Sequence, residues 1–243
     1  MVERAALITG ASGGIGLAIA AVLAEEGYGL TLSARRPEKL EDAVAPLREA
    51  GHAVETVAAD VSDEDQLKAV FAAHEERFGR LDALVNNAGV GIGAPLADIQ
   101  TKFLDMQLAV NLRSIILGTR EGLPLLRKAG AEHRKALIVN TASIAGKTGQ
   151  PWLSIYGATK AAVVNFSVAT EREVGGEGIA CTALAPGFVD TDMSEFVTGS
   201  IPAETMIRPS DIGEAVRYLL KLSPNCHIPE IVFTRPGEAI GAP

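Results

Sequence analysis

Residues 5–16 read AALITGASGGIG, an apolar run that leads directly into a glycine-rich turn. Residues 5–9 are typical of a buried strand, and a helical pattern follows the turn to about Gly27. Free N–H groups and the helix dipole at such a turn favour anions, and glycine allows close approach of a pyrophosphate. The spacing is GxxxGxG through Gly10, Gly14 and Gly16, not the strict GxGxxG. The stretch indicates a phosphate-binding βα unit, with a plain tight turn as the alternative.

The rest of the chain repeats this alternation. Further strand-like runs lie at residues 30–34, 54–59, 81–86, 136–141, 179–185 and 230–234, and further helical patterns at about 37–50, 62–78, 101–126, 152–174 and 210–222. Seven strands alternating with six helices predict parallel βαβ units with right-handed crossovers. The expected fold is α/β, a Rossmann-type doubly wound parallel seven-stranded sheet with helices on both faces. No linker, repeat or low-complexity stretch divides the chain, so residues 1–243 are predicted to form a single domain.

Composition limits the class of protein. The chain of 243 residues is 47% hydrophobic and 21% charged, as globular domains are. Its formal net charge of −8 disfavours partners such as nucleic acid and anionic membranes. The apolar run at residues 17–24 is much shorter than the roughly 20 residues of a membrane span, and no signal peptide pattern begins the chain. We therefore expect a cytoplasmic protein.

Metal and thiol chemistry are disfavoured by the spacing of cysteines and histidines. The two cysteines lie far apart and the four histidines occur singly, at Cys181, Cys226, His52, His74, His133 and His227. No pair has the spacing of a zinc site or of a disulfide framework. The sequence predicts no metal, and catalysis must use other groups.

The segment after the second strand bears on the choice of cofactor. An acidic residue there binds the ribose hydroxyls of NAD, whereas arginine suits the 2′-phosphate of NADP. The chain has Arg35 and Arg36, and no carboxylate before Glu38. Guanidinium groups pair well with phosphate. The sequence therefore favours NADP(H) over NAD(H), although a solvated basic pair at a helix start is the simpler alternative.

Tyr156 and Lys160 form the clearest candidate for acid–base chemistry. They are four residues apart, so they share one face of the predicted helix. A phenol has a pKa of about 10, and a nearby ammonium lowers it. The pair could exchange a proton near neutral pH. A chance pair on a helix is the alternative, because this spacing alone is weak evidence.

Other polar residues follow the predicted strands. Ser143 follows the fifth strand, Asn86-Asn87-Ala88-Gly89 ends the fourth and Asp60 follows the third, while Asn111 lies in the long helical pattern as a buried amide that needs partners. Each alone is more typical of a cap or turn. Together they are expected at the carboxyl edge of the sheet, where ligands bind.

These motifs together resemble the short-chain dehydrogenase/reductase family over nearly the whole chain. The resemblance rests on the glycine turn, the NNAG element at 86–89, the spacing of Asn111, Ser143, Tyr156 and Lys160, and the stretch PGFVDT at 186–191. It implies a nicotinamide-dependent oxidoreductase in which the cofactor supplies the hydride.

The resemblance also assigns roles. Tyr156 would exchange a proton with the substrate oxygen, Ser143 would hydrogen-bond that oxygen, Lys160 would lower the Tyr156 pKa and hold the ribose, and Asn111 would hold a relay water. Asp60 and Val61 would contact the adenine, Asn87 the neighbouring ribose, and Val189 and Thr191 would position the carboxamide. The full set expected at the cofactor is Gly10, Ser12, Gly14, Ile15, Gly16, Arg35, Arg36, Asp60, Val61, Asn87, Ala88, Gly89, Tyr156, Lys160, Pro186, Gly187, Val189 and Thr191.

The substrate is expected to be a small, neutral carbonyl or alcohol. The resemblance places Gln150, Trp152 and Met193 at the substrate, the last within a substrate loop at about 188–208. One alternative is a 3-oxoacyl-carrier-protein reductase, with Arg127, Lys128 and Arg172 available for an acidic carrier. The tail at 228–237 departs from many carrier-linked members, because it lacks their Gly-Gly segment. Another alternative is a non-catalytic cofactor-binding redox sensor, which need not keep the tyrosine and the lysine.

An assembly of identical subunits is also expected. The helical patterns at 101–126 and 152–174 are apolar on more than one face, and a sheet covers only one face of a helix. We predict a homo-oligomer through these helices, a homotetramer by family resemblance or else a homodimer.

Overall fold

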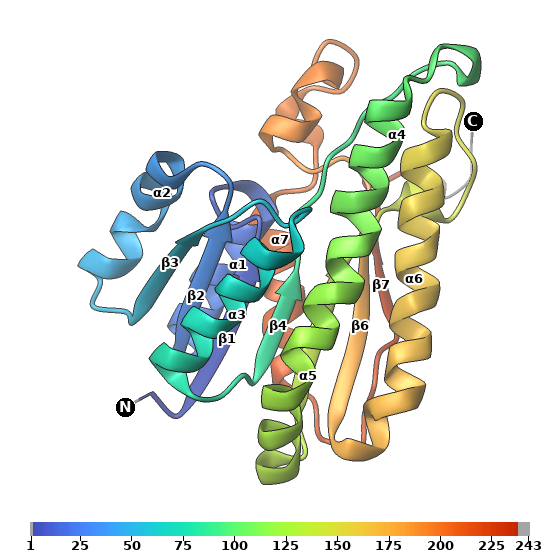
Figure 1. Cartoon of the computed structure of the whole chain (residues 1–243). Helices are drawn as coiled ribbons and strands as arrows, with labels where there is room; N and C mark the ends of the chain where they lie inside the picture. The colour runs from blue at the N-terminus through green and yellow to red at the C-terminus, as the bar shows by residue number, and fades with distance from the viewer. Residues whose placement is uncertain (1, 238–243) are drawn as a thin grey trace.

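The computed structural model describes residues 2–237 (Figure 1). Its strands are β1 (Arg4–Thr9), β2 (Tyr28–Ala34), β3 (Val54–Ala58), β4 (Ala83–Asn86), β5 (Ala136–Thr141), β6 (Ile179–Pro186) and β7 (Glu230–Phe233). Its α-helices are α1 (Gly14–Glu25), α2 (Pro37–Glu49), α3 (Glu64–Phe78), α4 (Thr101–Leu108), α5 (Ser114–His133), α6 (Ser154–Val174) and α7 (Pro209–Lys221).

The strands form one parallel sheet in the order β3-β2-β1-β4-β5-β6-β7. The order reverses direction between β1 and β4, which is the switch point where doubly wound sheets bind ligands. The register places Thr9 beside Ser33, and Asn86 beside Asn140. The carboxyl ends of the central strands therefore lie at one edge, and the predicted doubly wound seven-stranded sheet is confirmed.

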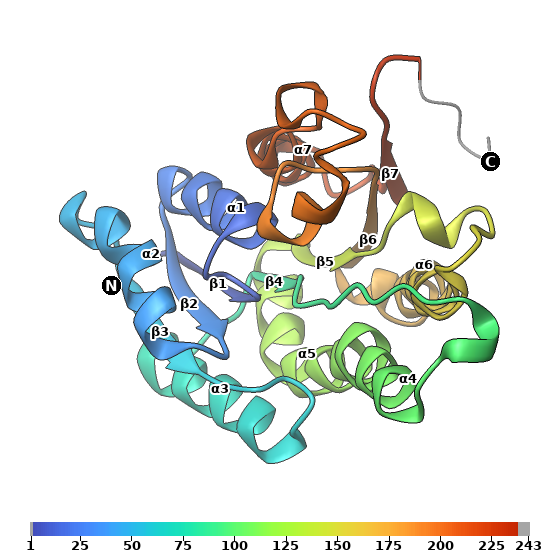
Figure 2. The same cartoon turned by 90° about the horizontal axis from the view of Figure 1, so that it is seen from above.

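Helices cover both faces of the sheet (Figure 2). On one face α1, α2 and α7 pack with the fully buried side chains of Ile19, Leu40 and Val216. On the other face α3 and α5 pack with Leu67 and Leu126, and α6 adds Val163. Continuous apolar runs in the central strands fit a sheet that is buried on both sides. No helix within residues 2–237 is long and apolar enough to cross a membrane.

The helical pattern predicted at 101–126 differs from the structure in two ways. A π-helical turn, Ala109–Arg113, separates α4 from α5. In addition, α5 continues to His133, because Ala129 and Gly130 are still buried, and it ends where Arg134 adopts a left-handed backbone with φ of 55°. Short π turns occur often at functional sites, and this one contains Asn111.

Two other predicted boundaries are wrong. The pattern at 62–78 begins too early, since Asp63 rather than Ser62 is the N-cap of α3 and accepts hydrogen bonds from the N–H groups of Asp65 and Gln66. The pattern at 152–174 includes two residues too many, because Trp152 has a left-handed backbone with φ of 58° and α6 begins at Ser154.

The predicted substrate loop is tied at both ends. Val189 and Ile207 form a parallel β-bridge, and the Asp190 N–H donates to the Ile207 carbonyl at 2.9 Å. Between these ends the chain forms the 3-10 helices Asp192–Val197 and Ala203–Thr205. The pinned ends hold the first of these helices beside the carboxyl edge of the sheet.

Candidate active site

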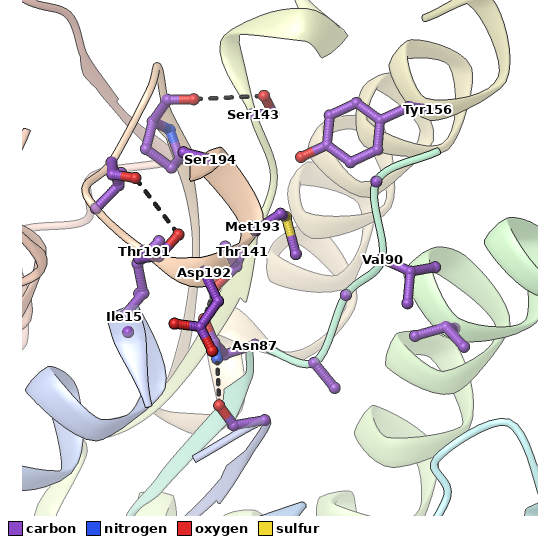
Figure 3. A pocket seen from close by; sticks show the side chains of 18 of the residues that line it. Ile15, Asn87, Val90, Thr141, Ser143, Tyr156, Thr191, Asp192, Met193 and Ser194 are labelled. Carbon is purple, nitrogen blue, oxygen red and sulfur yellow. Dashed lines mark hydrogen bonds between the residues drawn. The ribbon is translucent and has the colours of Figure 1, made fainter. Parts of the chain in front are cut away.

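The carboxyl edge of the sheet opens onto a cavity of about 740 Å³ (Figure 3). Its walls come from the turn after β1, the segments after β2 to β6, and the start of α6. Every residue predicted for catalysis, cofactor or substrate lines this cavity except Gly16 and Asn111, which support the wall from behind.

The glycine turn leaves room for a phosphate beside the start of α1. Gly10 has φ of 67°, and a methyl group there would lie 2.8 Å from the Ala88 Cα. A methyl group at Gly16 would lie 2.4 Å from the Gly10 carbonyl oxygen, so only glycine lets α1 pack onto the turn. The first turn of α1 has no acidic residue, and its N-cap Gly13 provides no side-chain cap. The helix therefore presents uncapped N–H donors to the cavity.

Asn87 holds this turn in place from the end of β4. Its Nδ2 donates to the carbonyls of Thr9 and Gly10 at 3.2 Å, and its Oδ1 accepts from the Thr141 hydroxyl at 3.1 Å. The Thr9 hydroxyl in turn accepts from the N–H groups of Asn87 and Ala88. The Asn87 side chain therefore links the glycine turn after β1 to the end of β5. Its contact with the ribose stays a prediction.

Three basic side chains lie where the ribose of an adenine nucleotide is expected. Arg35, Arg36 and Lys39 line the cavity beyond β2. The Lys39 ammonium donates to the Asp192 carboxylate at 2.6 Å, and this pairing, together with nearby Arg36, lowers the Asp192 pKa. Asp192 belongs to the substrate loop, so the ion pair joins α2 to the loop across the cavity.

The Tyr156 phenol enters the cavity from the first turns of α6, and the Ser143 side chain lies across from it (Figure 3). Ser143 is the N-cap of the short 3-10 helix Ile144–Gly146, and its hydroxyl lies 3.4 Å from the Pro186 carbonyl. Burial raises the Tyr156 pKa, and a hydrogen bond from Ser143 only partly opposes this rise. The prediction that this pKa is lowered is therefore wrong.

The burial and the hydrogen bond of Lys160 explain why its ammonium does not lower the Tyr156 pKa. The side chain is buried, and burial lowers the Lys160 pKa to about 8. Its Nζ donates to the Thr141 carbonyl at 2.7 Å and lies 5.7 Å from the centre of the Tyr156 ring. The ammonium is thus directed to the end of β5, at the base of the cavity.

Asn111 is fully buried behind the NNAG segment. Its Oδ1 accepts from the Val90 N–H, and its Nδ2 donates to the Val90 carbonyl, both at 2.8 Å. A methyl group at Gly89 would lie 3.5 Å from the Asn111 Oδ1 and 3.6 Å from the Lys160 Nζ. The π turn thus brings Asn111 close to Lys160 and fixes the chain that forms the cavity wall, and the need of this amide for partners is confirmed.

Several lining residues were not singled out from the sequence. Lys39 lies one helical turn beyond Arg36, which was a usable signal. The chain from Val90 to Gly93 carried no recognisable pattern, and it lines the cavity between Asn111 and Trp152. Thr141 ends a predicted strand, and its carbonyl became important only through Lys160.

The cavity suits a dinucleotide. The first N–H groups of α1 are uncapped, the glycines of the turn have no side chains to obstruct a ligand, and basic side chains cluster beyond β2. These elements form a Rossmann-type site for an anionic nucleotide.

Comparison with known proteins extends this result. A family profile described as short chain dehydrogenase matches residues 4–200. A 3-oxoacyl-[acyl-carrier-protein] reductase FabG of Staphylococcus aureus strain Mu50 is 33% identical over 225 residues, covering 89% of this chain and 90% of the relative.

Solved structures agree with the sequence comparison. An alcohol dehydrogenase of the archaeon Thermococcus sibiricus, complexed with 5-hydroxy-NADP, has a TM-score of 0.84 and 32% identity, covering 94% of this chain and 95% of that one. A levodione reductase has a TM-score of 0.86 and 32% identity, covering 98% of each chain.

The fold and the cavity define a nucleotide-binding α/β protein of Rossmann type. The chain belongs to the short-chain dehydrogenase family, which comprises oxidoreductases that use a nicotinamide cofactor.

Proposed function

We propose that the protein is an NADP(H)-dependent oxidoreductase that transfers hydride between the nicotinamide and a small carbonyl or alcohol substrate. One observation carries this proposal: a single cavity holds Tyr156, Ser143 and Lys160 at one end and Arg35, Arg36 and Lys39 at the other. The strand order places the glycine turn between the two groups, as in a Rossmann-type dinucleotide site.

The chain's own groups handle the proton. The raised pKa of Tyr156 keeps the phenol protonated at neutral pH, as a donor to a carbonyl oxygen requires. Ser143 would hydrogen-bond the same oxygen. When bound, the cofactor supplies the hydride during reduction and accepts it during oxidation.

Lys160 and Asn111 would complete the proton path. The Lys160 ammonium lies at the base of the cavity, where it can hold the nicotinamide ribose. Both ends of the Asn111 amide are already occupied by Val90. We therefore expect a relay water at Asn111 to use its backbone carbonyl within the π turn.

The preference for NADP(H) is supported by charge. Arg35, Arg36 and Lys39 line the cavity beyond β2. The connection between β2 and α2 consists of the two arginines and contains no carboxylate. The T. sibiricus structure, complexed with 5-hydroxy-NADP, agrees with this preference.

The test is cofactor oxidation by the purified protein with NADPH and NADH in parallel, against small ketones, aldehydes, diketones and an acetoacetyl thioester. We expect turnover of an uncharged ketone with NADPH. Turnover only with NADH would contradict the role of Arg35 and Arg36. Binding of NADPH without turnover of any carbonyl would contradict the catalytic proposal.

A 3-oxoacyl-carrier-protein reductase is the second candidate, supported by the 33% identity to FabG. Two of the cations considered for carrier docking are already paired in the structure. Arg127 pairs with Glu177 at 2.5 Å, and Lys128 lies 3.8 Å from Glu75. A clear preference for the thioester in the same assay would favour this candidate.

We also infer a cytoplasmic homo-oligomer, a homotetramer or homodimer. Met106, Leu108 and Ile116 leave apolar surface exposed on and beside α4 and α5. This exposed surface lies on the helices predicted to form the interface, and light scattering in solution tests it.

A further inference from the structure

Three large apolar side chains remain exposed where the cavity opens. Trp152 and Met193 are each 45% exposed and Phe196 is 62% exposed, although all three line the cavity. Contiguous exposed apolar surface marks a place that a ligand or partner covers. Because the same cavity holds the Tyr156 phenol, the covering group is expected to enter with the substrate.

Trp152 has an unusual backbone conformation. Its φ is 58°, and its carbonyl accepts from the Ala94 N–H at 2.8 Å. A methyl group at Gly93 would lie 1.8 Å from the Trp152 Cε3, so the indole occupies the space of a side chain at position 93. Strained residues of this kind concentrate where ligands are clamped.

Phe196 extends this aromatic surface from the substrate loop. Its ring meets the Trp152 ring edge to face, with 5.7 Å between the centroids and 87° between the planes. This is a favoured arrangement for two aromatic rings. It joins the loop to the start of α6 on the substrate side of the cavity.

Met193 carries the apolar surface inward to the phenol. A methyl group at Gly91 would lie 3.8 Å from both the Met193 Sδ and the Tyr156 Cε2. Figure 3 shows the Met193 side chain beside Tyr156. Apolar side chains therefore line the cavity both beside Tyr156 and at Trp152.

The charged side chains closest to this apolar surface already have partners. Among the described residues that line the cavity, the charged side chains are Arg35, Arg36, Lys39, Asp60, Lys160 and Asp192. Lys160 is bonded to the Thr141 carbonyl, and Asp192 is paired with Lys39. A substrate carboxylate placed against Trp152 would lose its hydration without gaining a cation.

We propose that the substrate is an uncharged carbonyl or alcohol that carries an apolar ring next to the reacting carbon, and that this ring lies against Trp152 and Phe196. The inference rests on the proposed oxidoreductase function and narrows its substrate class. Trp152 and Phe196 are then specificity-determining residues, and the bound ring covers the surface that they leave exposed.

The first test uses fluorescence, because Trp152 is the one tryptophan of the chain. The protein is saturated with NADP⁺, so that no hydride is available to a ketone. Acetophenone is then titrated in parallel with its para-carboxylate. We expect a saturable change in Trp152 emission with acetophenone, and a weaker affinity for the carboxylate by about tenfold or more. Unsaturable quenching by both compounds, or tighter binding of the carboxylate, would overturn the proposal.

The second test measures kcat/KM with NADPH for acetophenone and for butanone, which has no ring. Phe196→Ala is expected to lower the value for acetophenone about tenfold and the value for butanone less than about threefold. Tyr218→Ala is the matched control, since Tyr218 is an exposed aromatic residue on α7 outside the cavity lining. Equal losses with both ketones would overturn the proposal.

The two tests separate this inference from the proposed function. Equal turnover of butanone and acetophenone would overturn the ring site and leave the oxidoreductase standing. Saturable binding of acetophenone without turnover of any ketone would support the ring site and contradict the oxidoreductase.

Discussion

The Lys39 ammonium and the Asp192 carboxylate are 2.6 Å apart, although 153 positions separate them in the chain. Lys39 lies in the first turn of α2 beside Arg36, and Asp192 begins the 3-10 helix of the substrate loop. One ion pair thus connects the proposed site of the 2′-phosphate with the predicted substrate loop. A phosphate bound at Lys39 would compete with Asp192, so cofactor and loop are electrostatically linked.

Lys39→Ala should weaken NADPH binding by about tenfold and leave NADH binding nearly unchanged, because only NADPH carries the phosphate. Asp192→Asn should tighten NADPH binding by about two- to threefold, the size of a lost exposed ion pair, and the gain should shrink in high salt. Calorimetric titration measures both constants. Lys68→Ala is the matched control, as an exposed lysine of α3 outside the cavity lining. Equal effects of Lys39→Ala on both cofactors would contradict the assignment.

Tyr156→Phe should lower kcat about 10²–10⁴-fold, the usual contribution of a positioned acid–base group. The variant keeps the ring and removes only the hydroxyl, so NADPH binding and circular dichroism should be unchanged. Stopped-flow measurement of a single turnover separates the loss in the chemical step from any change in binding. A variant that retains most of its rate would exclude Tyr156 as the proton donor.

Lys160 should make cofactor affinity depend on pH. Its pKa is lowered to about 8 by burial, so raising the pH through 8 removes a positive charge at the base of the cavity. The affinity for anionic NADPH should therefore fall as the pH rises from 7 to 9. Lys160→Met should bind more weakly at pH 7 and lack this step. An identical pH dependence in the variant would assign the step to another group.

The exposed apolar surface on α5 should be an interface. Ile116 is 40% exposed within a helix whose other face packs on the sheet. Ile116→Asp should lower the mass measured by light scattering, because a buried carboxylate would lack a partner in the assembly. Lys128→Asp, an exposed change farther along the same helix, serves as the control. A native protein that is already monomeric would refute the predicted oligomer.

Much of this architecture could be predicted because its determinants are local. The glycine turn and the polar residues at strand ends are recognisable in short stretches of sequence. The parallel topology then brings distant motifs such as Asn87 and Tyr156 to one edge of the sheet. The rest depends on contacts that no short pattern encodes. The Lys39–Asp192 pair, the left-handed backbone of Trp152 and the π turn at Asn111 arise from tertiary packing.

The Tyr156 pKa shows the same limit in energetic terms. The spacing of Tyr156 and Lys160 predicts a lowered pKa for Tyr156, because spacing reports only the attraction between the phenolate and the ammonium. Burial acts on both groups at once, raising the pKa of the phenol and lowering that of the ammonium. The depth of a side chain, which decides the balance, follows from the assembled fold rather than from spacing.

His74 should make the fold sensitive to acid. Its Nε2 lies 2.8 Å from the Arg80 carbonyl, which can only accept, so Nε2 carries the proton and Nδ1 accepts the Thr31 hydroxyl at 2.8 Å. A second proton on Nδ1 would force the Thr31 hydroxyl to become the acceptor, so the hydrogen of this buried hydroxyl would lose His74 as its partner. Burial lowers the His74 pKa from 6.5 to about 4.

Because the folded pKa lies below the unfolded one, the unfolded chain binds more protons between pH 6.5 and 4. The contribution of His74 is complete above pH 6.5 and is lost as the pH falls, by about 3 kcal/mol in all. Denaturant titrations followed by circular dichroism at pH 7, 5.5 and 4.5 measure the free energy of unfolding. His74→Gln should be less stable at pH 7 and lose less stability on acidification than the native protein, whereas His52→Gln, on the loop before β3, should behave like the native protein. Parallel losses in all three proteins would show that other groups cause the acid sensitivity.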